Sequence, residues 1–266
     1  MSVLGILGVG DLTDKLVRGL RRSGYCGGIL LSPRNAERSA LLAEECDCRI
    51  MASNQAVVDG AQTIIVGVRP RLLAELAAQV TLREDQHLIS LMAGISLDQL
   101  TAAFPQARCV RVMLSYAALF NQSTVVICPP DPLGEQLLAP LGQLVVLKEE
   151  SAFELATVAA CMNGWFYFLL HDLQQWLSDK GLSPEEARTL VLGNLQDCIA
   201  TAQYHPEQTL SALGQSIATP GTFTYAGLEV LMHQPASATW GAACEVVLDA
   251  LLTRSRLESQ ASRNQS

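Results

Sequence analysis

The chain has 266 residues, of which 49% are hydrophobic and 17% are charged, and its formal net charge is −8. This length and composition suffice for one large core or two ordinary ones, with apolar surface left over for a subunit interface. The acidic balance and the lack of a Lys/Arg cluster argue against a nucleic-acid partner. The longest apolar run, residues 155–170, is shorter than a bilayer requires, so we expect a buried helix and no membrane partner.

Eight cysteines are scattered along the chain without a CxxC pair or the Cys/His spacing of a metal site. In a large chain whose first residues lack a signal-peptide pattern, they are expected to be reduced core residues. The sequence therefore predicts a cytoplasmic protein without a metal site.

The first half of the sequence alternates short apolar runs with amphipathic stretches. Unbroken apolar runs are typical of strands that are buried on both faces of a parallel sheet. The predicted strands are residues 3–7, 28–32, 49–52, 63–68, 87–91, 109–113 and 124–128, and the predicted helices include residues 15–22 and 35–45. Because alternating strands and helices imply crossover connections, we predict an α/β fold in which residues 1–150 form a doubly wound, Rossmann-type parallel sheet.

The second half carries helical patterns instead, over residues 151–180, 183–205 and 237–254. The pair Ser183-Pro184 supplies a cap and a first-turn proline for the second of these helices. We predict an all-α domain over residues 151–256 that holds substrate and dimerises. A flexible polar tail is predicted over residues 257–266.

A glycine turn joins the first strand to the first helix, in the sequence ILGVGDLTDKLVRGL at residues 6–20. In the dinucleotide-binding fingerprint, the first glycine permits a tight turn and the second lets the backbone approach a pyrophosphate at the helix N-terminus. The third fingerprint position holds Thr13 instead of glycine or alanine. We predict that Gly8, Gly10, Leu12 and Thr13 contact a dinucleotide. The alternative is an ordinary glycine turn between a strand and a helix.

The end of the second strand indicates which dinucleotide. A site for NAD usually has an acidic residue there for the ribose 2′-hydroxyl, but this chain reads LLSPRN and has no acid before Glu37. The hydroxyl of Ser32 and the guanidinium of Arg34 suit a 2′-phosphate, because an anion favours charge-assisted donors. We therefore expect NADP(H) in preference to NAD(H), unless Arg34 is merely a solvated loop residue.

Segments along nearly the whole chain carry a family resemblance: LGVG, SPRNAER, SNQAVVDGAQTIIVGVRP at 53–70, SLMAGISLDQL at 90–100, VRVM at 110–113 and TPGTFTYAGLEVL at 219–231. The sequence resembles the pyrroline-5-carboxylate reductases, which reduce a cyclic imine carboxylate to proline with NAD(P)H. The resemblance implies a homodimer or a larger homo-oligomer. It also implies that a cofactor cleft is lined by Asn54, Val68, Arg69, Pro70, Ala93 and Gly94.

The resemblance extends to the substrate site, with departures. The family holds the substrate carboxylate in a Ser-Pro-Gly-Gly-x-Thr segment at a helix start, and this chain has TPGTFT at 219–224. By this resemblance Thr219, Gly221, Thr222 and Phe223 would bind substrate. Thr224 would contact the carboxylate or supply the proton. Thr157 matches a family threonine near the substrate nitrogen, and we count it with Thr224 as a candidate catalytic residue.

Two other segments depart further from the family. Residues 113–118 lack the two prolines and the asparagine of the family's M-P-N-T-P-A, and residues 160–165 replace a small, glycine-rich S-G-S-G-P-A with bulky residues. These departures favour a different imine as substrate, and the alternative is that catalysis has been lost.

Imine reduction asks little of the protein beyond positioning and a dry cleft. A β-hydroxyacid dehydrogenase would instead need a lysine among the apolar helices. The lysines are Lys15, Lys148 and Lys180, and none falls in the apolar stretch 157–173. A protein that binds NADPH without catalysis, as a scaffold, is the other alternative.

Overall fold

The computed structural model describes residues 3–233 and 236–263. The chain packs as two compact units, one formed by Met1–Ala160 with Leu248–Ser266 and the other by Cys161–Val247. The first unit, which we call the sheet unit, contains the sheet and the helices that cover it. The second unit, which we call the helical unit, is built from helices.

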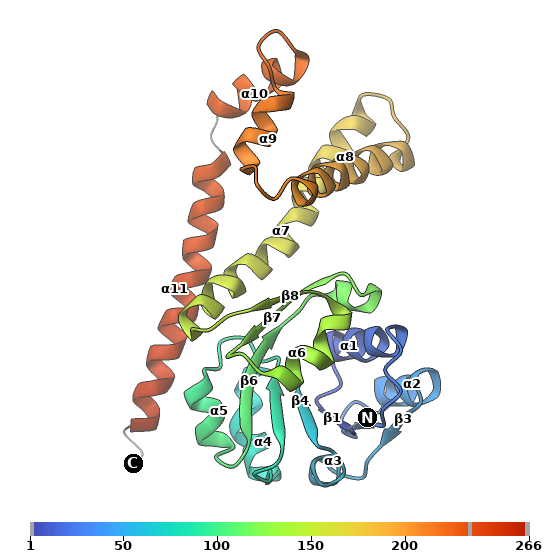
Figure 1. Cartoon of the computed structure of the whole chain (residues 1–266), viewed down its shortest axis with the longest axis vertical. Helices are drawn as coiled ribbons and strands as arrows, with labels where there is room; N and C mark the ends of the chain where they lie inside the picture. Colours follow the sequence, from blue (N-terminus) through green and yellow to red (C-terminus); the bar gives the residue numbers. More distant parts are fainter. Residues whose placement is uncertain (1–2, 234–235, 264–266) are drawn as a thin grey trace. The chain divides into compact units, whose positions relative to one another are not determined.

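A single eight-stranded sheet forms the centre of the first unit (Figure 1). Its strand order is β3-β2-β1-β4-β5-β6-β7-β8, and the first six strands pair in parallel in the order of a Rossmann-type fold. The strands are β1 (Leu4–Leu7), β2 (Ile29–Leu31), β3 (Cys48–Ile50), β4 (Thr63–Val66), β5 (His87–Ser90), β6 (Arg108–Met113), β7 (Ser123–Cys128) and β8 (Gly142–Val146). The predicted fold class is thus confirmed.

The last two strands differ from the prediction. β7 pairs antiparallel with β6, and β8, which the sequence analysis missed, pairs parallel with β7. A parallel crossover needs about a dozen residues or more, and the connection over residues 114–122 is too short, so the chain must turn back. β8 begins at Gly142, where a Cβ atom would lie 2.0 Å from the carbonyl oxygen of Ser123.

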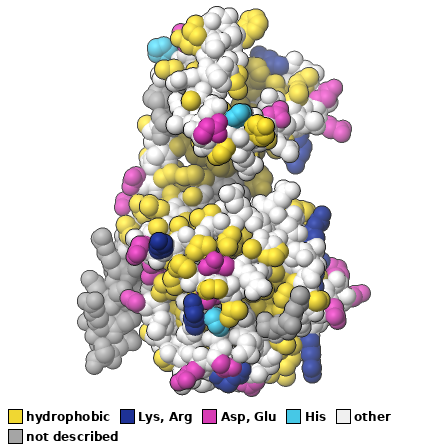
Figure 2. Space-filling model, viewed as in Figure 1, with side chains coloured by type: hydrophobic (Ala, Val, Ile, Leu, Met, Phe, Trp, Pro, Cys, Tyr) yellow, Lys and Arg dark blue, Asp and Glu magenta, His cyan; other side chains and the backbone are white. Residues whose placement is uncertain are grey.

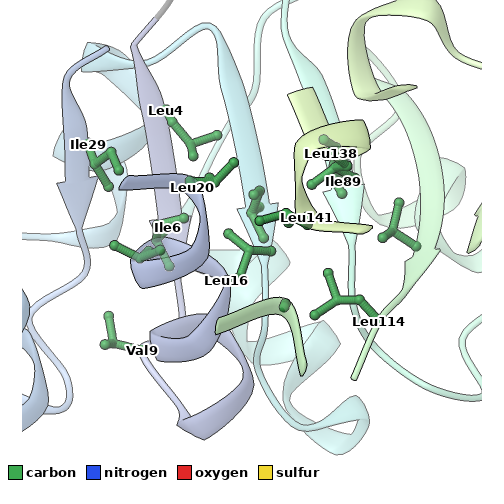
Figure 3. Close-up of a cluster of buried hydrophobic side chains, with 14 of the residues drawn as sticks. Leu4, Ile6, Val9, Leu16, Leu20, Ile29, Ile89, Leu114, Leu138 and Leu141 are labelled. Carbon is green, nitrogen blue, oxygen red and sulfur yellow. The ribbon is translucent and has the colours of Figure 1, made fainter. Parts of the chain in front are cut away.

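Helices cover both faces of the sheet. One face carries α1 (Asp11–Arg22), α2 (Ala36–Cys46) and α6 (Pro132–Leu138), and the other carries α3 (Asn54–Gly60), α4 (Leu73–Gln79) and α5 (Leu97–Ala103). Figure 3 shows the core on the first of these faces, where Leu16 and Leu20 of α1 pack on Ile6 and its neighbours. Successive side chains of β1 point to opposite faces, so Ile6 belongs to one core and Leu7 to the other.

A buried arginine ties β6 to the start of α7 (Glu150–Asp179). Arg111 is 1% exposed, and its Nη1 donates to Oε1 of Glu150 at 2.7 Å and to Oε1 of Glu154 at 2.6 Å. The same Glu150 oxygen accepts from the backbone N–H of Leu97 at 2.7 Å. The guanidinium carbon lies 4.3 Å from the centre of the Phe153 ring. These contacts fix the first turns of α7 within the sheet unit.

The helical half is also as predicted in outline. Residues 150–179 form one continuous helix, and α8 (Pro184–Tyr204) begins with Ser183 and Glu186 in a reciprocal capping box. They are followed by α9 (Leu210–Ile217), α10 (Phe223–His233) and α11 (Ala236–Arg263). α11 continues into the segment predicted as a flexible tail, because no glycine or proline interrupts its end. Residues 264–266 of that tail lie outside the described residues.

The apolar helix predicted to be buried is largely exposed within the chain. Of α7 only Phe153, Thr157 and Val158 are buried, and Tyr167 and Phe168 are 70% and 73% exposed. By length and composition alone, α7 would also suffice to cross a membrane. The expected burial of this helix therefore requires cover from outside the chain, because an apolar pattern shows that a helix face needs cover without showing what covers it.

The other helices of the second unit share this exposure, and hydrophobic side chains are visible at the surface in Figure 2. Ala187 is the one buried residue of α8, and among the described residues α9 and α10 have none. An apolar groove of about 500 Å³ lies between α7 and α8. Its lining includes Leu169, Leu173, Trp176, Leu190, Leu195 and Cys198, and we call it the α7–α8 groove.

The prediction that the cysteines are core residues is correct for only part of them. Cys46, Cys48 and Cys128 are buried, whereas Cys26 and Cys198 are exposed and the others are intermediate. Burial raises the pKa of Cys48 to about 11, so this thiol is not a reactive one.

Candidate functional site

The glycine turn after β1 leaves an opening at the N-terminus of α1. Gly8 has a φ of +93°, and a Cβ atom there would lie 2.6 Å from Cγ1 of Val68, so only glycine fits. Gly10 has an ordinary φ of −101°, and apart from its two chain neighbours no atom of the described residues would lie within 4 Å of its Cβ. Gly10 therefore faces open space, beside a helix end whose N–H groups favour an anion.

Thr13, which stands at the third fingerprint position in place of glycine or alanine, stabilises the glycine turn. Its hydroxyl accepts from the N–H of Gly10 at 2.7 Å and lies 3.0 Å from the carbonyl oxygen of Gly8, to which it can donate. A Cβ on Gly67, the residue after β4, would lie only 2.3 Å from Cγ2 of Thr13. The bulk added at position 13 is thus accommodated by the glycine at position 67. The sequence analysis missed Gly67, although a glycine directly after a buried strand was a usable signal.

The segment after β2 closes over the glycine turn. Ser32 is 1% exposed, and its hydroxyl accepts from the N–H of Gly8 at 3.0 Å. Asn35, the N-cap of α2, donates from Nδ2 to the carbonyl oxygen of Val9 at 2.9 Å. Ser32 therefore holds the glycine turn through this hydrogen bond, and the contact predicted between Ser32 and a 2′-phosphate stays a prediction. Sequence reasoning missed the role of Asn35.

Two arginines lie at this edge. The side chain of Arg34 is 64% exposed and its Nη1 lies 3.6 Å from Oε1 of Glu75, a distance typical of a weak surface pair. Arg38, which sequence reasoning also missed, forms an ion pair with Asp11 at the first residue of α1. The sequence gives no local signal for this pairing, because Asp11 and Arg38 are 27 residues apart.

The other residues predicted to contact the cofactor follow neighbouring strands. Val68, Arg69 and Pro70 follow β4, and Ala93 and Gly94, whose φ is +71°, follow β5. Because the carboxyl ends of parallel strands share one edge of a sheet, the topology brings these loops to the edge that holds Gly8. Val68 lies against the glycine turn itself.

Asn54 lies at the start of α3, which follows β3, and its Nδ2 donates to Oε1 of Gln79 at 2.7 Å. Leu12 is half-buried in the first turn of α1. For both residues, contact with a cofactor stays a prediction.

The candidate catalytic threonine of α7 is occupied by its own helix. Thr157 is 7% exposed, and its hydroxyl donates to the carbonyl oxygen of Phe153 at 2.9 Å, a common bond for a threonine within a helix. In this geometry the Thr157 hydroxyl can accept a hydrogen bond, but its proton is already donated to Phe153. A role as proton donor would require this bond to break.

The TPGTFT segment forms the N-terminal turn of α10. Gly221 has a φ of +88°, and the Thr222 hydroxyl donates to the carbonyl oxygen of Thr219 at 2.7 Å. The same hydroxyl accepts from the N–H of Tyr225 at 3.1 Å, so Thr222 caps the helix. Thr219 and Thr224 are exposed, and Phe223 is 99% exposed, with no part of its own unit against it.

One of the divergent segments has a structural role in the sheet unit. Residues 116–120 form a 3₁₀ turn, η2 (Tyr116–Phe120), capped by Ser115. A Cβ on Gly19 of α1 would lie 2.1 Å from the carbonyl oxygen of Ala118, so η2 packs directly on the fingerprint helix. The other divergent segment, residues 160–165, lies within the continuous helix α7.

Two family descriptions match the chain. Residues 3–94 match the family described as "NADP oxidoreductase coenzyme F420-dependent", and residues 149–251 match "Pyrroline-5-carboxylate reductase dimerisation". The second match covers the helices whose apolar faces are exposed in the single chain.

Individual relatives agree with these matches. The chain is 26% identical to a pyrroline-5-carboxylate reductase of Haemophilus influenzae over 96% of this chain and 97% of that protein. It is 26% identical to the Pisum sativum enzyme, over 86% and 87% of the two chains. Its fold is similar to that of the Streptococcus pyogenes enzyme (TM-score 0.82, 24% identity, 94% and 98% covered). It is also similar to that of the Plasmodium falciparum enzyme with NADP bound (TM-score 0.84, 18% identity, 96% and 98% covered).

Proposed function

Because the chain belongs to the pyrroline-5-carboxylate reductase family of oxidoreductases, we propose that it reduces a cyclic imine carboxylate with NADPH. The substrate would be pyrroline-5-carboxylate, giving proline, or a related imine. The dimerisation domain makes a homo-oligomer the expected form of the protein.

The observation that carries the proposal is the opening at Gly10. A strand, a left-handed glycine and a helix N-terminus meet there, and the position of the missing Cβ is unobstructed by the described residues. This is the geometry that lets a backbone approach a pyrophosphate. The dinucleotide supplies the hydride when it is bound.

The preference for NADP(H) over NAD(H) rests on Arg34, which follows the carboxyl end of β2. Arg34 is exposed and only loosely held by Glu75, so its guanidinium can reach a ribose 2′-phosphate without breaking a strong bond. The Plasmodium falciparum relative, which has NADP bound, supports the same choice. NADP(H) in preference to NAD(H) is therefore part of the proposal.

The substrate carboxylate is assigned to the N-terminal turn of α10. Thr222 already uses its hydroxyl in the helix cap, so the hydroxyls of Thr219 and Thr224 and the N–H groups of the first turn are the donors proposed for an anion. An iminium is electrophilic already, so holding its carboxylate and excluding water can suffice for hydride transfer.

The test is NADPH oxidation, followed by absorbance, with pyrroline-5-carboxylate and with a six-membered cyclic imine carboxylate. Gly10→Ala should keep the fold and lose at least about tenfold in NADPH affinity, because its methyl group fills the opening. Gly28→Ala is the matched control, because Gly28 lies at the amino end of β2, at the edge of the sheet opposite the glycine turn. Its Cβ would lie 3.7 Å from Val3, an ordinary contact, so NADPH affinity should not change.

Turnover with either imine, together with the loss in Gly10→Ala alone, supports the proposal. Tight NADPH binding without turnover of any imine would identify a non-catalytic NADPH-binding protein. The absence of binding to either nicotinamide dinucleotide would overturn the proposal.

A further inference from the structure

An acidic side chain stands where the proposed function needs an anion to bind. Asp11 is the first residue of α1, directly after Gly10, and its side chain is 63% exposed. A carboxylate at a helix N-terminus stabilises the helix through its dipole. The same carboxylate repels a pyrophosphate at that end of the helix, because like charges a few ångströms apart repel even near a protein surface.

The structure provides a countercharge from another element. Arg38, in the first turn of α2, forms an ion pair with Asp11, and its side chain is 30% exposed. The hydrogen bond to Asp11 raises the pKa of Arg38 above its usual value, so it is charged at any working pH. No other cation is paired with Asp11 in the described part of the chain, since Lys15 and Arg18 pair with Asp14.

Arg38 is also held beside the turn. Its backbone N–H donates to Oδ1 of Asn35 at 3.4 Å, and Nδ2 of Asn35 donates to the carbonyl oxygen of Val9 at 2.9 Å. Asn35 therefore joins the first turn of α2 to the glycine turn. The guanidinium of Arg38 is kept in reach of Asp11 by this connection, independently of any ligand.

We propose that the Asp11–Arg38 pair sets the charge of the dinucleotide turn: Arg38 neutralises Asp11 and so permits the pyrophosphate to bind. In this role Arg38 is a positioning residue that acts through Asp11 and does not contact the 2′-phosphate. The inference rests on the proposed function. It further predicts that NADPH and NADH are affected alike, because both carry the pyrophosphate.

The test is a double-mutant cycle in which the dissociation constants of NADPH and NADH are measured by titration. Arg38→Gln should weaken both dinucleotides about fivefold, because it leaves Asp11 uncompensated. Asp11→Asn should match or exceed the wild-type affinity for both. The double variant Asp11→Asn/Arg38→Gln should bind both as Asp11→Asn does, because there is no charge left to neutralise. The effect of Arg38→Gln should shrink in 0.5 M salt.

Arg34→Gln serves as the comparison, because the proposed function predicts that it weakens NADPH and leaves NADH unchanged. If Arg38→Gln behaves in the same way and Asp11→Asn does not rescue it, Arg38 reads the 2′-phosphate and the inference is overturned. Equal loss in Arg38→Gln and in the double variant, with a lowered melting temperature, would show a purely structural role and also overturn it. Failure of the wild type to bind either dinucleotide would instead overturn the proposed function.

Discussion

The two units of this chain differ in how far their apolar side chains are buried within the chain. In the sheet unit, strands such as β1 and β4 are fully buried between two layers of helices from the same chain. In the helical unit, α8 buries one residue and α9 and α10 bury none within the described chain, although these helices carry large apolar side chains such as Leu190, Leu210 and Leu231. The contrast shows that a hydrophobic pattern predicts burial but not its source. The match to a dimerisation family over residues 149–251 supports a homo-oligomer, so we expect a second copy to cover these helices.

Breaking a contact inside the sheet unit should have the largest effect on the free energy of unfolding. Arg111→Leu removes the one cation that Glu150 and Glu154 share in a buried position. Because two partly buried carboxylates are then left without their cation, we expect the free energy of unfolding in urea to fall by up to about 3 kcal/mol. The unit is completed by its own chain, so the loss should be the same at low and high protein concentration.

Two further variants make this measurement specific. Arg83→Leu breaks a half-exposed pair with Asp85 and should change the free energy of unfolding by less than about 1 kcal/mol. Replacing both carboxylates in Arg111→Leu/Glu150→Gln/Glu154→Leu should restore most of the loss. A small effect of Arg111→Leu alone would mean that the buried cluster does not stabilise the unit.

A charge in the helical unit should act through association instead. Leu173 lines the α7–α8 groove and is 47% exposed in the single chain. If a second copy covers this groove, Leu173→Glu should weaken association by about 2–4 kcal/mol, measured as the dissociation constant of the oligomer by sedimentation.

Gln175→Glu is the matched control, because it adds the same charge to α7 outside the residues that line the groove. We expect it to dissociate at nearly the wild-type concentration. Unchanged assembly of Leu173→Glu would mean that the groove is not part of the interface, and it would remove the proposed explanation for the exposed face of α7.

A third prediction concerns the close packing that distinguishes the sheet unit. Gly67→Ala forces a methyl group to within 2.3 Å of Cγ2 of Thr13, and overpacking of this kind costs about 1–3 kcal/mol in the free energy of unfolding. Thr13→Ser removes that methyl group and keeps the hydroxyl that holds the turn. The double variant should therefore be more stable than Gly67→Ala alone. If the two substitutions are simply additive, the compensation between positions 13 and 67 is wrong.

The same contrast explains which features the sequence reveals. Buried strands and the Gly8–Gly10 turn leave local patterns, because period and residue type follow from contacts within a short segment. The pairing of Arg38 with Asp11 and the bond from Asn35 to Val9 join segments that are far apart in the sequence, so no local pattern marks them. The direction of β7 could have been predicted, because the short connection over residues 114–122 is visible in the sequence. The exposure of Phe223 and of α7 depends on another molecule.

The smallest effect that we predict is the pH dependence contributed by Asp14 of α1. Burial acts to raise the pKa of this carboxyl, but hydrogen bonds and charges from Lys15 and Arg18 outweigh burial and hold the pKa below its usual value. A carboxyl whose pKa is lowered on folding stabilises the fold above its unfolded pKa, near 4, and this stabilisation disappears as the pH falls through the folded pKa. Asp14→Asn should thus be less stable than the wild type at pH 7, by at most about 1 kcal/mol. The difference in urea midpoint should vanish at the acid end of a titration from pH 7 to pH 2.

Asp85→Asn, at a half-exposed carboxyl, is the control and should show a smaller difference at pH 7. A difference for Asp14→Asn that persists unchanged at low pH would mean that its ion pairs with Lys15 and Arg18 do not stabilise the fold, and that the substitution acts through packing alone.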